Sequence, residues 1–187
     1  SVRDPVKAEE VQAAARRLAE MGAEALVIFF VNSYANNSNE QAAVLAARAV
    51  WPNEFVMASS EILPEIREFE RASTAALNAY LQPVLGHYLQ RLETALAADG
   101  FAGEVLIHQS NGGVMQVGTA RRLPVRTALS GPAAGVVAAG HIAQAAGFEN
   151  VITCDMGGTS FDVSVVAGGD HAISPQTSID FGLVIRT

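Results

Sequence analysis

The chain has a single cysteine, Cys154, and no run of basic residues among its 187 positions. One cysteine excludes an internal disulfide and fits a reducing cytoplasmic compartment. The formal net charge of −7 argues against nucleic acid and anionic membranes as partners, because both reward clustered lysine and arginine. The sequence also shows no signal-peptide pattern and no apolar run long enough to cross a bilayer. We therefore expect a cytoplasmic protein without a membrane or nucleic-acid partner.

The composition is that of a globular protein, with 50% hydrophobic and 17% charged residues. A chain of 187 residues is long enough for one or two domains with a real core. The four histidines are scattered and show no ligand spacing, so a protein-bound transition metal is not expected. They are His87, His108, His141 and His171.

The stretch from Cys154 to Val163 predicts a phosphate-binding hairpin. An apolar strand ends in Asp155, two glycines and two hydroxyl residues follow, and apolar residues then alternate with polar ones. Gly157 and Gly158 can take positive φ and turn N–H groups toward an anion. The alternative is a solvent-facing Gly-Gly turn. The acid at the end of an apolar strand favours the phosphate interpretation. Cys154 is interpreted as a small buried strand residue.

Small residues dominate the segment before this hairpin, from Thr127 to Gly140. Ser130 or Gly131 is the expected N-cap, and the helix is expected to run to about Gly147. A helix of alanine and glycine can approach a neighbouring backbone closely, although a buried core helix explains the composition almost as well.

Strand and helix patterns alternate along the rest of the chain. We expect a helix capped by Asp4 and ended by Gly22, and a long helix over 69–98 with a kink or break at Pro83. The other expected elements are a strand at 25–31, a helix from Ser38 or Asn39 to about 50, strands at 54–58, 104–108 and about 126–129, and a helical turn at 119–122. The alternation predicts a mainly parallel sheet, with the hairpin beginning an antiparallel part.

Acidic and basic residues cluster between positions 61 and 71. They could be paired acids for proton transfer, or carboxylates that the dipole of a following helix favours. The cluster comprises Glu61, Glu65, Glu68 and Glu70 with Arg67 and Arg71.

Four separated motifs carry a family resemblance: 155–164 with the preceding 130–135, then 32–36, then 59–65 through 70–74, and 109–113. Together they resemble the hydantoinase A and 5-oxoprolinase family, which includes N-methylhydantoinase A subunits and subunits of acetone carboxylase and other ketone carboxylases. The wider resemblance is to the actin, Hsp70 and sugar-kinase ATPase superfamily. It implies an α/β fold of the actin-like ATPase (ribonuclease H-like) type, a mixed sheet flanked by helices.

The resemblance implies binding of ATP with Mg²⁺. Asp155 would be catalytic and would hold the magnesium, directly or through water. The phosphates would be lined by Gly157, Gly158, Thr159 and Ser160, and also by Gly112 and Gly113. Asn111 would be a second catalytic residue, with an Asn-Gly turn as the open alternative. Chaperones of this superfamily have a third glycine at the position of Thr159 and an acid at that of Gly131, so their hydrolytic machinery does not carry over.

The implied activity is ATP-dependent opening of a cyclic amide or imide, such as hydantoin or 5-oxoproline. The alternatives are a subunit of an ATP-dependent ketone carboxylase and a chaperone-like nucleotide-binding module. A small-molecule cyclic amide or ketone would be the substrate, and a partner subunit or a homo-oligomer is expected.

The resemblance also suggests how the chain is divided. Residues 1–68 would end a first lobe and include a family-specific insertion, 69–147 would complete that lobe with its connecting helix, and 148–187 would begin a second lobe. The chain starts without methionine and ends in a strand pattern, so we expect a fragment that is inactive by itself.

Overall fold

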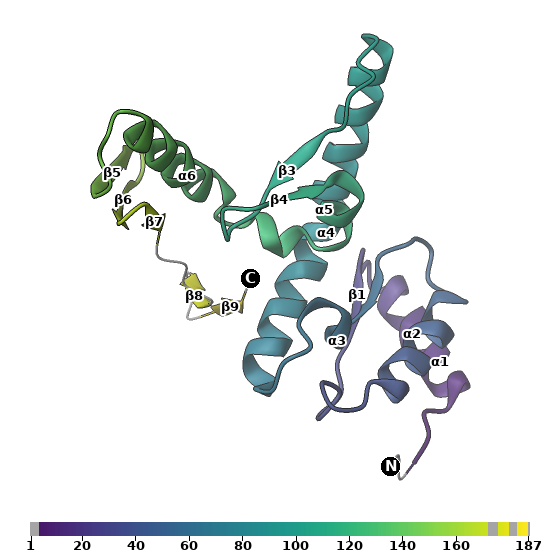
Figure 1. Ribbon diagram of the computed structural model, residues 1–187. Coiled ribbons are helices and arrows are strands. Elements are labelled where there is room, and N and C mark those ends of the chain that lie inside the picture. Colours follow the sequence, from purple (N-terminus) through teal and green to yellow (C-terminus); the bar gives the residue numbers. More distant parts are fainter. Residues whose placement is uncertain (1–3, 172–175, 180–182, 187) are drawn as a thin grey trace. The chain divides into compact units, whose positions relative to one another are not determined.

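The computed structural model describes residues 4–171, 176–179 and 183–186 (Figure 1). It separates into two compact units. The first contains the described residues up to Arg91 together with those of 176–179 and 183–186, and the second begins at Leu92. The three-part division expected from the sequence stays a prediction.

The first unit contains a β-α-β arrangement, as the sequence predicts. Strands β1 (Leu26–Ile28) and β2 (Val56–Ala58) pair in parallel, with Val27 opposite Met57. Helix α2 (Ser38–Arg48) connects them, and α1 (Ala8–Glu20) packs on α2. A parallel pair needs such a crossover because a tight turn can join only antiparallel strands.

The core of this unit lies between the two helices and the two strands. Apolar side chains at helical spacing on α1 and α2 meet the buried faces of the strands. Its buried members are Ala15, Val44, Ala47, Trp51, Val56 and Ala58. Gly22 ends α1 with a φ of +87°, as expected. The expected start is wrong, because Lys7 rather than Asp4 precedes the first helical residue.

Helix α4 (Glu68–Ala98) follows the short α3 (Ser59–Ile62). It runs through Pro83 without a break, which contradicts a division into two helices there. Pro83 is buried beside Gln82, whose amide nitrogen lies 3.3 Å from the sulfur of Met57. Packing therefore holds the turn despite the backbone hydrogen bond that proline cannot make. Gly100, with a φ of +82°, follows the end of the helix.

The second unit continues with an antiparallel pair, β3 (Leu106–His108) and β4 (Val114–Gln116). The sequence interpretation missed β4. Helix α5 (Val117–Arg122) covers the expected helical turn. The strand expected near 126–129 is wrong, because Pro124–Thr127 forms the 3₁₀ helix η1. The Thr127 hydroxyl donates a 2.8 Å hydrogen bond to the carbonyl of Pro124 and stabilises this turn.

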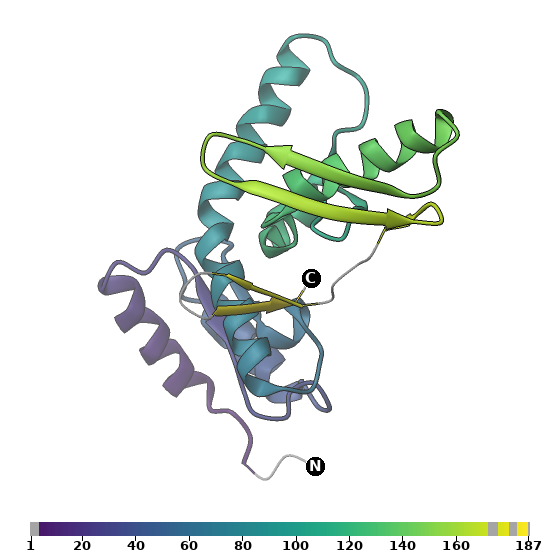
Figure 2. The ribbon, with the colours of Figure 1, turned by 90° about the vertical axis from the view of Figure 1, so that its left-hand side faces the viewer.

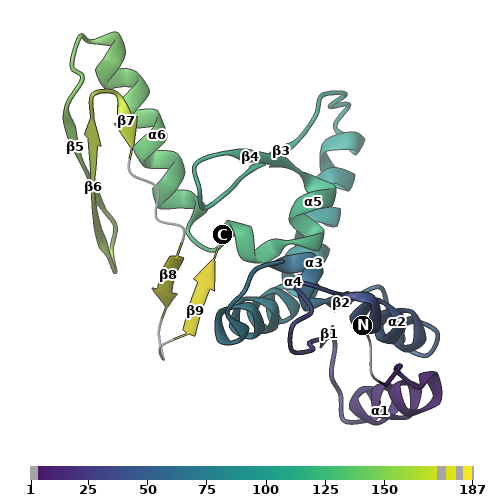
Figure 3. The same cartoon turned by 60° about the horizontal axis from the view of Figure 1, so that its bottom comes forward.

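Helix α6 (Ser130–Ala145) lies along the sheet formed by β5 (Val151–Met156), β6 (Phe161–Ala167) and β7 (Asp170–His171) (Figures 2 and 3). A Cβ at Gly140 would lie 3.7 Å from Val166. The missing side chain thus lets the helix approach the sheet closely. Strands β8 (Gln176–Ile179) and β9 (Leu183–Arg186) form a separate antiparallel pair.

The mixed α/β class is confirmed, but the expectation of a mainly parallel sheet is wrong. Only β1 and β2 are parallel among the described strands, and the other pairs are antiparallel. The physical reason is that β3 pairs with β4 through a short turn, a local partner that strand patterns alone did not reveal. None of the described helices is long and apolar enough to cross a membrane.

Candidate functional site

The β5–β6 hairpin places two carboxylates opposite each other. Its register pairs Asp155 with Asp162 and Met156 with Phe161. Side chains alternate across a strand, so Asp155 and Asp162 share one face. Like charges directly opposite each other are unfavourable unless something else stabilises them. Asp162 was not among the predicted site residues. The sequence could have revealed this pairing: with a four-residue turn at 157–160, Met156 lies opposite Phe161 and Asp155 opposite Asp162.

That face borders a cavity of about 270 Å³ between the hairpin and α6. Gly135 of α6 lies over Asp155, because a Cβ built on it would be 3.9 Å from the Asp155 Oδ2 atom. The polar groups of the lining come from the hairpin and the small ones from the helix. The lining comprises Pro132, Gly135, Val136, Ala139, Val151, Ile152, Thr153, Cys154, Asp155, Asp162 and Ser164.

The opposite face of the hairpin is apolar and exposed, with Ile152 and Val165 exposed by 69% and 58%. Cys154 is exposed as well, which contradicts the expected buried position. The expectation assumed that an apolar strand is covered on both faces. In the structure α6 covers only one of them.

The turn between the strands is closed by one hydrogen bond, from the N–H of Gly157 to the carbonyl of Ser160 at 3.0 Å. Neither Gly157 nor Gly158 takes the positive φ that glycine allows. A four-residue turn reverses the chain with ordinary φ values, so the left-handed conformation is not needed. All four turn residues are exposed, and nothing lies within 4 Å of a Cβ built on Gly158. An approaching ligand would therefore meet open backbone.

The Asn111 motif forms the turn between β3 and β4. The Asn111 Oδ1 atom accepts a 2.9 Å hydrogen bond from the N–H of Gly113, and Gly112 has a φ of +83°. The Asn-Gly turn is thus present. Of the two polar groups on the Asn111 side chain, the oxygen serves the turn and the amide NH₂ makes no hydrogen bond to a described residue. The turn and a ligand-binding role are compatible.

Ser110 connects this turn to the start of α6. Its N–H and its hydroxyl donate hydrogen bonds of 2.7 and 2.8 Å to the carbonyl of Arg126. Its hydroxyl oxygen accepts a 3.3 Å hydrogen bond from the N–H of Leu129, the residue before the helix begins. The Asn111 turn and the Asp155 hairpin, both predicted as parts of the site, therefore lie next to the N-terminal half of α6. No hydrogen bond joins Asn111 to Asp155 in the described part of the chain.

A second polar cluster lies in the first unit, at the carboxyl ends of β1 and β2. Glu40 of α2 is fully buried and accepts hydrogen bonds from the hydroxyl of Ser59 and the N–H groups of Phe30 and Ser60. Burial alone would raise the pKa of Glu40, but these hydrogen bonds outweigh it and hold the pKa below its ordinary value of 4.5. Sequence reasoning missed this residue, because nothing local marks an acid on an amphipathic helix as buried.

The acidic and basic cluster of 61–71 makes contacts that hold the fold. Arg71 is fully buried, pairs with Glu68 and donates to the carbonyl oxygens of Phe30 and Glu65. Glu70 pairs with Arg67 at the surface. The proton-transfer interpretation gains no support from these contacts.

Two family models match the chain. The hydantoinase/oxoprolinase model covers residues 71–186, and the model of the hydantoinase/oxoprolinase N-terminal region covers residues 1–51. The caprolactamase alpha subunit of Pseudomonas jessenii is 40% identical over 165 residues, which are 88% of this chain and 24% of that protein. The acetophenone carboxylase gamma subunit of Aromatoleum aromaticum is 32% identical over 176 residues, 89% of this chain and 23% of that one.

A solved nucleotide-free structure of acetone carboxylase, from work on ATP-dependent acetone carboxylation, superposes with a TM-score of 0.79. The identity is 26%, and the match covers 97% of this chain and 26% of the solved one. The chain thus spans about a quarter of the length of these relatives. The larger of the two models covers more than half of the chain, including the hairpin, and on that ground the chain belongs to the hydantoinase/oxoprolinase family.

Proposed function

We propose that this chain is the nucleotide-binding part of an enzyme that opens a cyclic amide with the help of ATP and Mg²⁺. The observation that carries the proposal is the pair Asp155 and Asp162, which face one cavity beneath Gly135 of α6. Two carboxylates that face each other in a cleft are unfavourable alone and become favourable when a divalent cation lies between them.

The residues at the cavity fit magnesium. Asp155 and Asp162 offer carboxylate oxygens and Ser164 a hydroxyl, all of them hard oxygen donors. Within the part of the chain that the structure describes, no group of three or more acidic, histidine or cysteine side chains could hold a metal ion. Magnesium does not need one, because it usually keeps several waters and binds through one or two carboxylates and the substrate phosphates.

The turn at 157–160 has the chemistry for phosphate oxygens. Its backbone is exposed, and Thr159 adds a hydroxyl donor, while the Ser160 hydroxyl donates a 3.4 Å hydrogen bond to the Asp162 Oδ2 atom. A cavity of about 270 Å³ is smaller than a whole nucleotide needs, so we assign it to the metal and the neighbouring phosphate region. The free amide NH₂ of Asn111, held in place by the turn, is the group that we assign to orienting a phosphate or the substrate carbonyl.

ATP supplies a phosphoryl group that turns the oxygen of a poorly electrophilic amide into a good leaving group. In this scheme the chain's own residues position the phosphates and the metal and neutralise their charges. Asp155 and Asp162 hold the metal, the turn donates hydrogen bonds, and α6 excludes water from one side. Catalysis of phosphoryl transfer rests mainly on such positioning and electrostatics.

Similarity supports a lactam or related cyclic amide as the substrate class, since the caprolactamase subunit shares 40% identity with the chain and the acetophenone carboxylase subunit 32%. Hydantoin and 5-oxoproline belong to the same chemical class. The second candidate is an ATP-dependent ketone carboxylase, favoured by the TM-score of 0.79 with acetone carboxylase. Both named subunits belong to enzymes of more than one subunit, so we also propose a partner subunit for this chain.

Two measurements test the proposal. The first uses Mn²⁺ as a magnesium probe on the chain alone, and reads the broadening of amide NMR signals from residues 151–166. We expect broadening that Asp155→Asn and Asp162→Asn each reduce, whereas Asp99→Asn, outside the cavity lining, leaves it unchanged. Equal broadening in all variants would contradict the metal site.

The second measurement uses the native polypeptide with any co-purifying subunit. ATP turnover is followed with a panel of lactams, hydantoin, 5-oxoproline and ketones. Stimulation by cyclic amides supports the first candidate, and stimulation by ketones with bicarbonate supports the second. Phosphate release that no small molecule stimulates would overturn both.

A further inference from the structure

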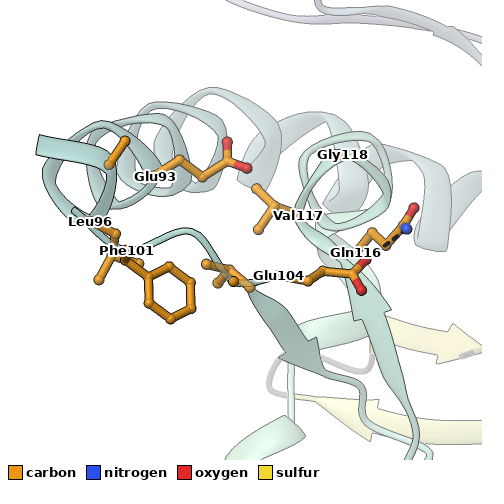
Figure 4. A pocket seen from close by; sticks show the side chains of 10 residues that line it. Glu93, Leu96, Phe101, Glu104, Gln116, Val117 and Gly118 are labelled. Atoms are coloured by element: carbon orange, nitrogen blue, oxygen red, sulfur yellow. Dashed lines mark hydrogen bonds between the residues drawn. The ribbon is translucent and has the colours of Figure 1, made fainter.

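A second cavity lies in the second unit, at the end of α4, and the proposed function does not use it. Its volume is about 360 Å³, within the range of small-molecule pockets. The end of α4, the following loop, β4 and α5 supply its lining (Figure 4). The lining comprises Glu93, Leu96, Ala97, Phe101, Gly103, Glu104, Val105, Gln116, Val117 and Gly118.

The walls of this cavity combine apolar and polar side chains. Leu96 and Phe101 lie on one side and Val117 on the other (Figure 4). The ring of Phe101 lies against the backbone of Gly103, where a Cβ would come within 2.5 Å of the ring carbon Cζ. Glycine at this position therefore lets the ring form the wall. Nothing lies within 4 Å of a Cβ built on Gly118, so the cavity is open beside α5.

The charged groups at the cavity have one sign. Glu93 and Glu104 contribute carboxylates, and none of the ten lining residues is basic. The Gln116 side chain donates a 2.8 Å hydrogen bond to the Glu104 Oε1 atom, which orients that carboxylate and leaves its other oxygen without a donor among the described residues. The last turn of α4 contains no basic residue either, so the negative end of its dipole adds to the same field.

A cavity that joins apolar side chains to two carboxylates is complementary to a cation on a short aliphatic stem. The stem would replace water on Leu96, Val105 and Val117, while the ammonium group would lie near the carboxylates. The face of an aromatic ring such as Phe101 also attracts a cation. We propose that this cavity binds an alkylammonium group, and that its main source is a free aliphatic amine rather than the lysine side chain of a peptide.

The test uses the whole 187-residue chain and three probes of equal stem length: hexylammonium, hexanol and hexanoate. Binding is followed by amide chemical-shift changes at Gly103 and Gly118. We expect hexylammonium to bind with a Kd on the order of 1 mM, as a ligand of so few atoms allows. Hexanol should bind several-fold more weakly and hexanoate not measurably. Equal affinity for hexylammonium and hexanol would overturn the proposal, because the carboxylates would then contribute nothing.

Variants separate charge from shape. Glu93→Gln and Glu104→Gln should each weaken hexylammonium about threefold, the effect of one exposed ion pair, while Glu149→Gln serves as the remote control. Gly118→Leu should fill the open side and abolish binding, whereas Gly131→Leu, also a helical glycine with open space around it, should not. Unchanged affinity in both glutamine variants or in Gly118→Leu would overturn the site.

A parallel titration with Nα-acetyl-lysine methylamide identifies the source of the ammonium group. Weaker binding than hexylammonium supports a free amine, because the backbone of the lysine probe finds no partner in the cavity. Tighter binding overturns that part of the proposal and assigns the site to a peptide side chain.

Discussion

The hydroxyl of Ser59 donates a 2.7 Å hydrogen bond to the carboxylate of Glu40, and both residues are fully buried. Glu40 comes from α2, and Ser59 directly follows β2. The same carboxylate accepts hydrogen bonds from the N–H of Phe30, just beyond β1, and from the N–H of Ser60. One acid thereby holds the segments that leave both parallel strands.

Replacing Glu40 tests this role. Glu40→Ala would leave the N–H of the partly buried Phe30 and two donors of the buried Ser59 and Ser60 without their acceptor, and we expect the free energy of unfolding to fall by about 3 to 5 kcal/mol. Glu40→Gln keeps one acceptor oxygen and should cost about 1 to 2 kcal/mol. Urea denaturation measures both, with the exposed Glu9→Gln on α1 as the control. A loss in Glu40→Ala no larger than in the control would refute the assignment.

The pH dependence of stability gives an independent check. The pKa of Glu40 is lower in the folded protein than its ordinary value of 4.5, so the carboxylate stabilises the fold at pH values above that value. This contribution is lost as the pH falls through the lowered pKa. The difference in unfolding free energy between wild type and Glu40→Gln should be constant above about pH 5.5 and shrink below pH 4.5. A difference that grows on acidification would have the wrong sign.

Arg71 supports the same edge from α4. Arg71 is fully buried, and its two terminal nitrogens donate hydrogen bonds to the Glu68 carboxylate and to the carbonyl oxygens of Phe30 and Glu65. Lysine cannot reproduce this planar arrangement, so Arg71→Lys should cost about 3 kcal/mol. Arg67→Lys is the matched control, because the Arg67 side chain makes an exposed ion pair with Glu70 and the change should alter stability by less than about 1 kcal/mol. Thermal unfolding distinguishes the two, and equal melting temperatures would count against a structural role for Arg71.

Gly135 tests the proposed nucleotide site by shape alone. A leucine at this position would extend from a Cβ that lies 3.9 Å from the Asp155 carboxylate and would fill the cavity. Gly135→Leu should therefore abolish binding of Mg²⁺-ATP, measured by calorimetry on the native polypeptide, without loss of helical circular dichroism. Gly131→Leu on the same helix meets open space and should bind normally. Normal Mg²⁺-ATP binding by Gly135→Leu would show that the nucleotide does not bind at this cavity.

Local signals in the sequence predicted much of the secondary structure. Gly22, Gly100 and Gly147 follow helices with φ between +82° and +88°, a conformation that glycine adopts without strain. The hairpin around residues 157–160 was predicted because alternating apolar residues flank a turn-forming sequence. Such features depend on residues that are close together in the chain, and the sequence shows these directly.

Features that depend on distant partners were missed or wrongly assigned. β4 was missed because its three residues are recognisable only beside β3. Cys154 was expected to be buried, since an apolar strand does not reveal how many of its faces are covered. Arg71 and Glu40 carry charge, and only their partners from other elements make burial tolerable.

The sequence by itself determined the β-α-β segment, the hairpin and the small-residue helix, because periodicity, glycine and short turns act within a few residues. Only the tertiary structure decided that Asp162 joins Asp155 at a cavity under Gly135, and that Glu40 and Arg71 are buried at the ends of the parallel strands. Those relationships arise from cross-strand register and helix packing, which bring together residues that the chain itself keeps apart.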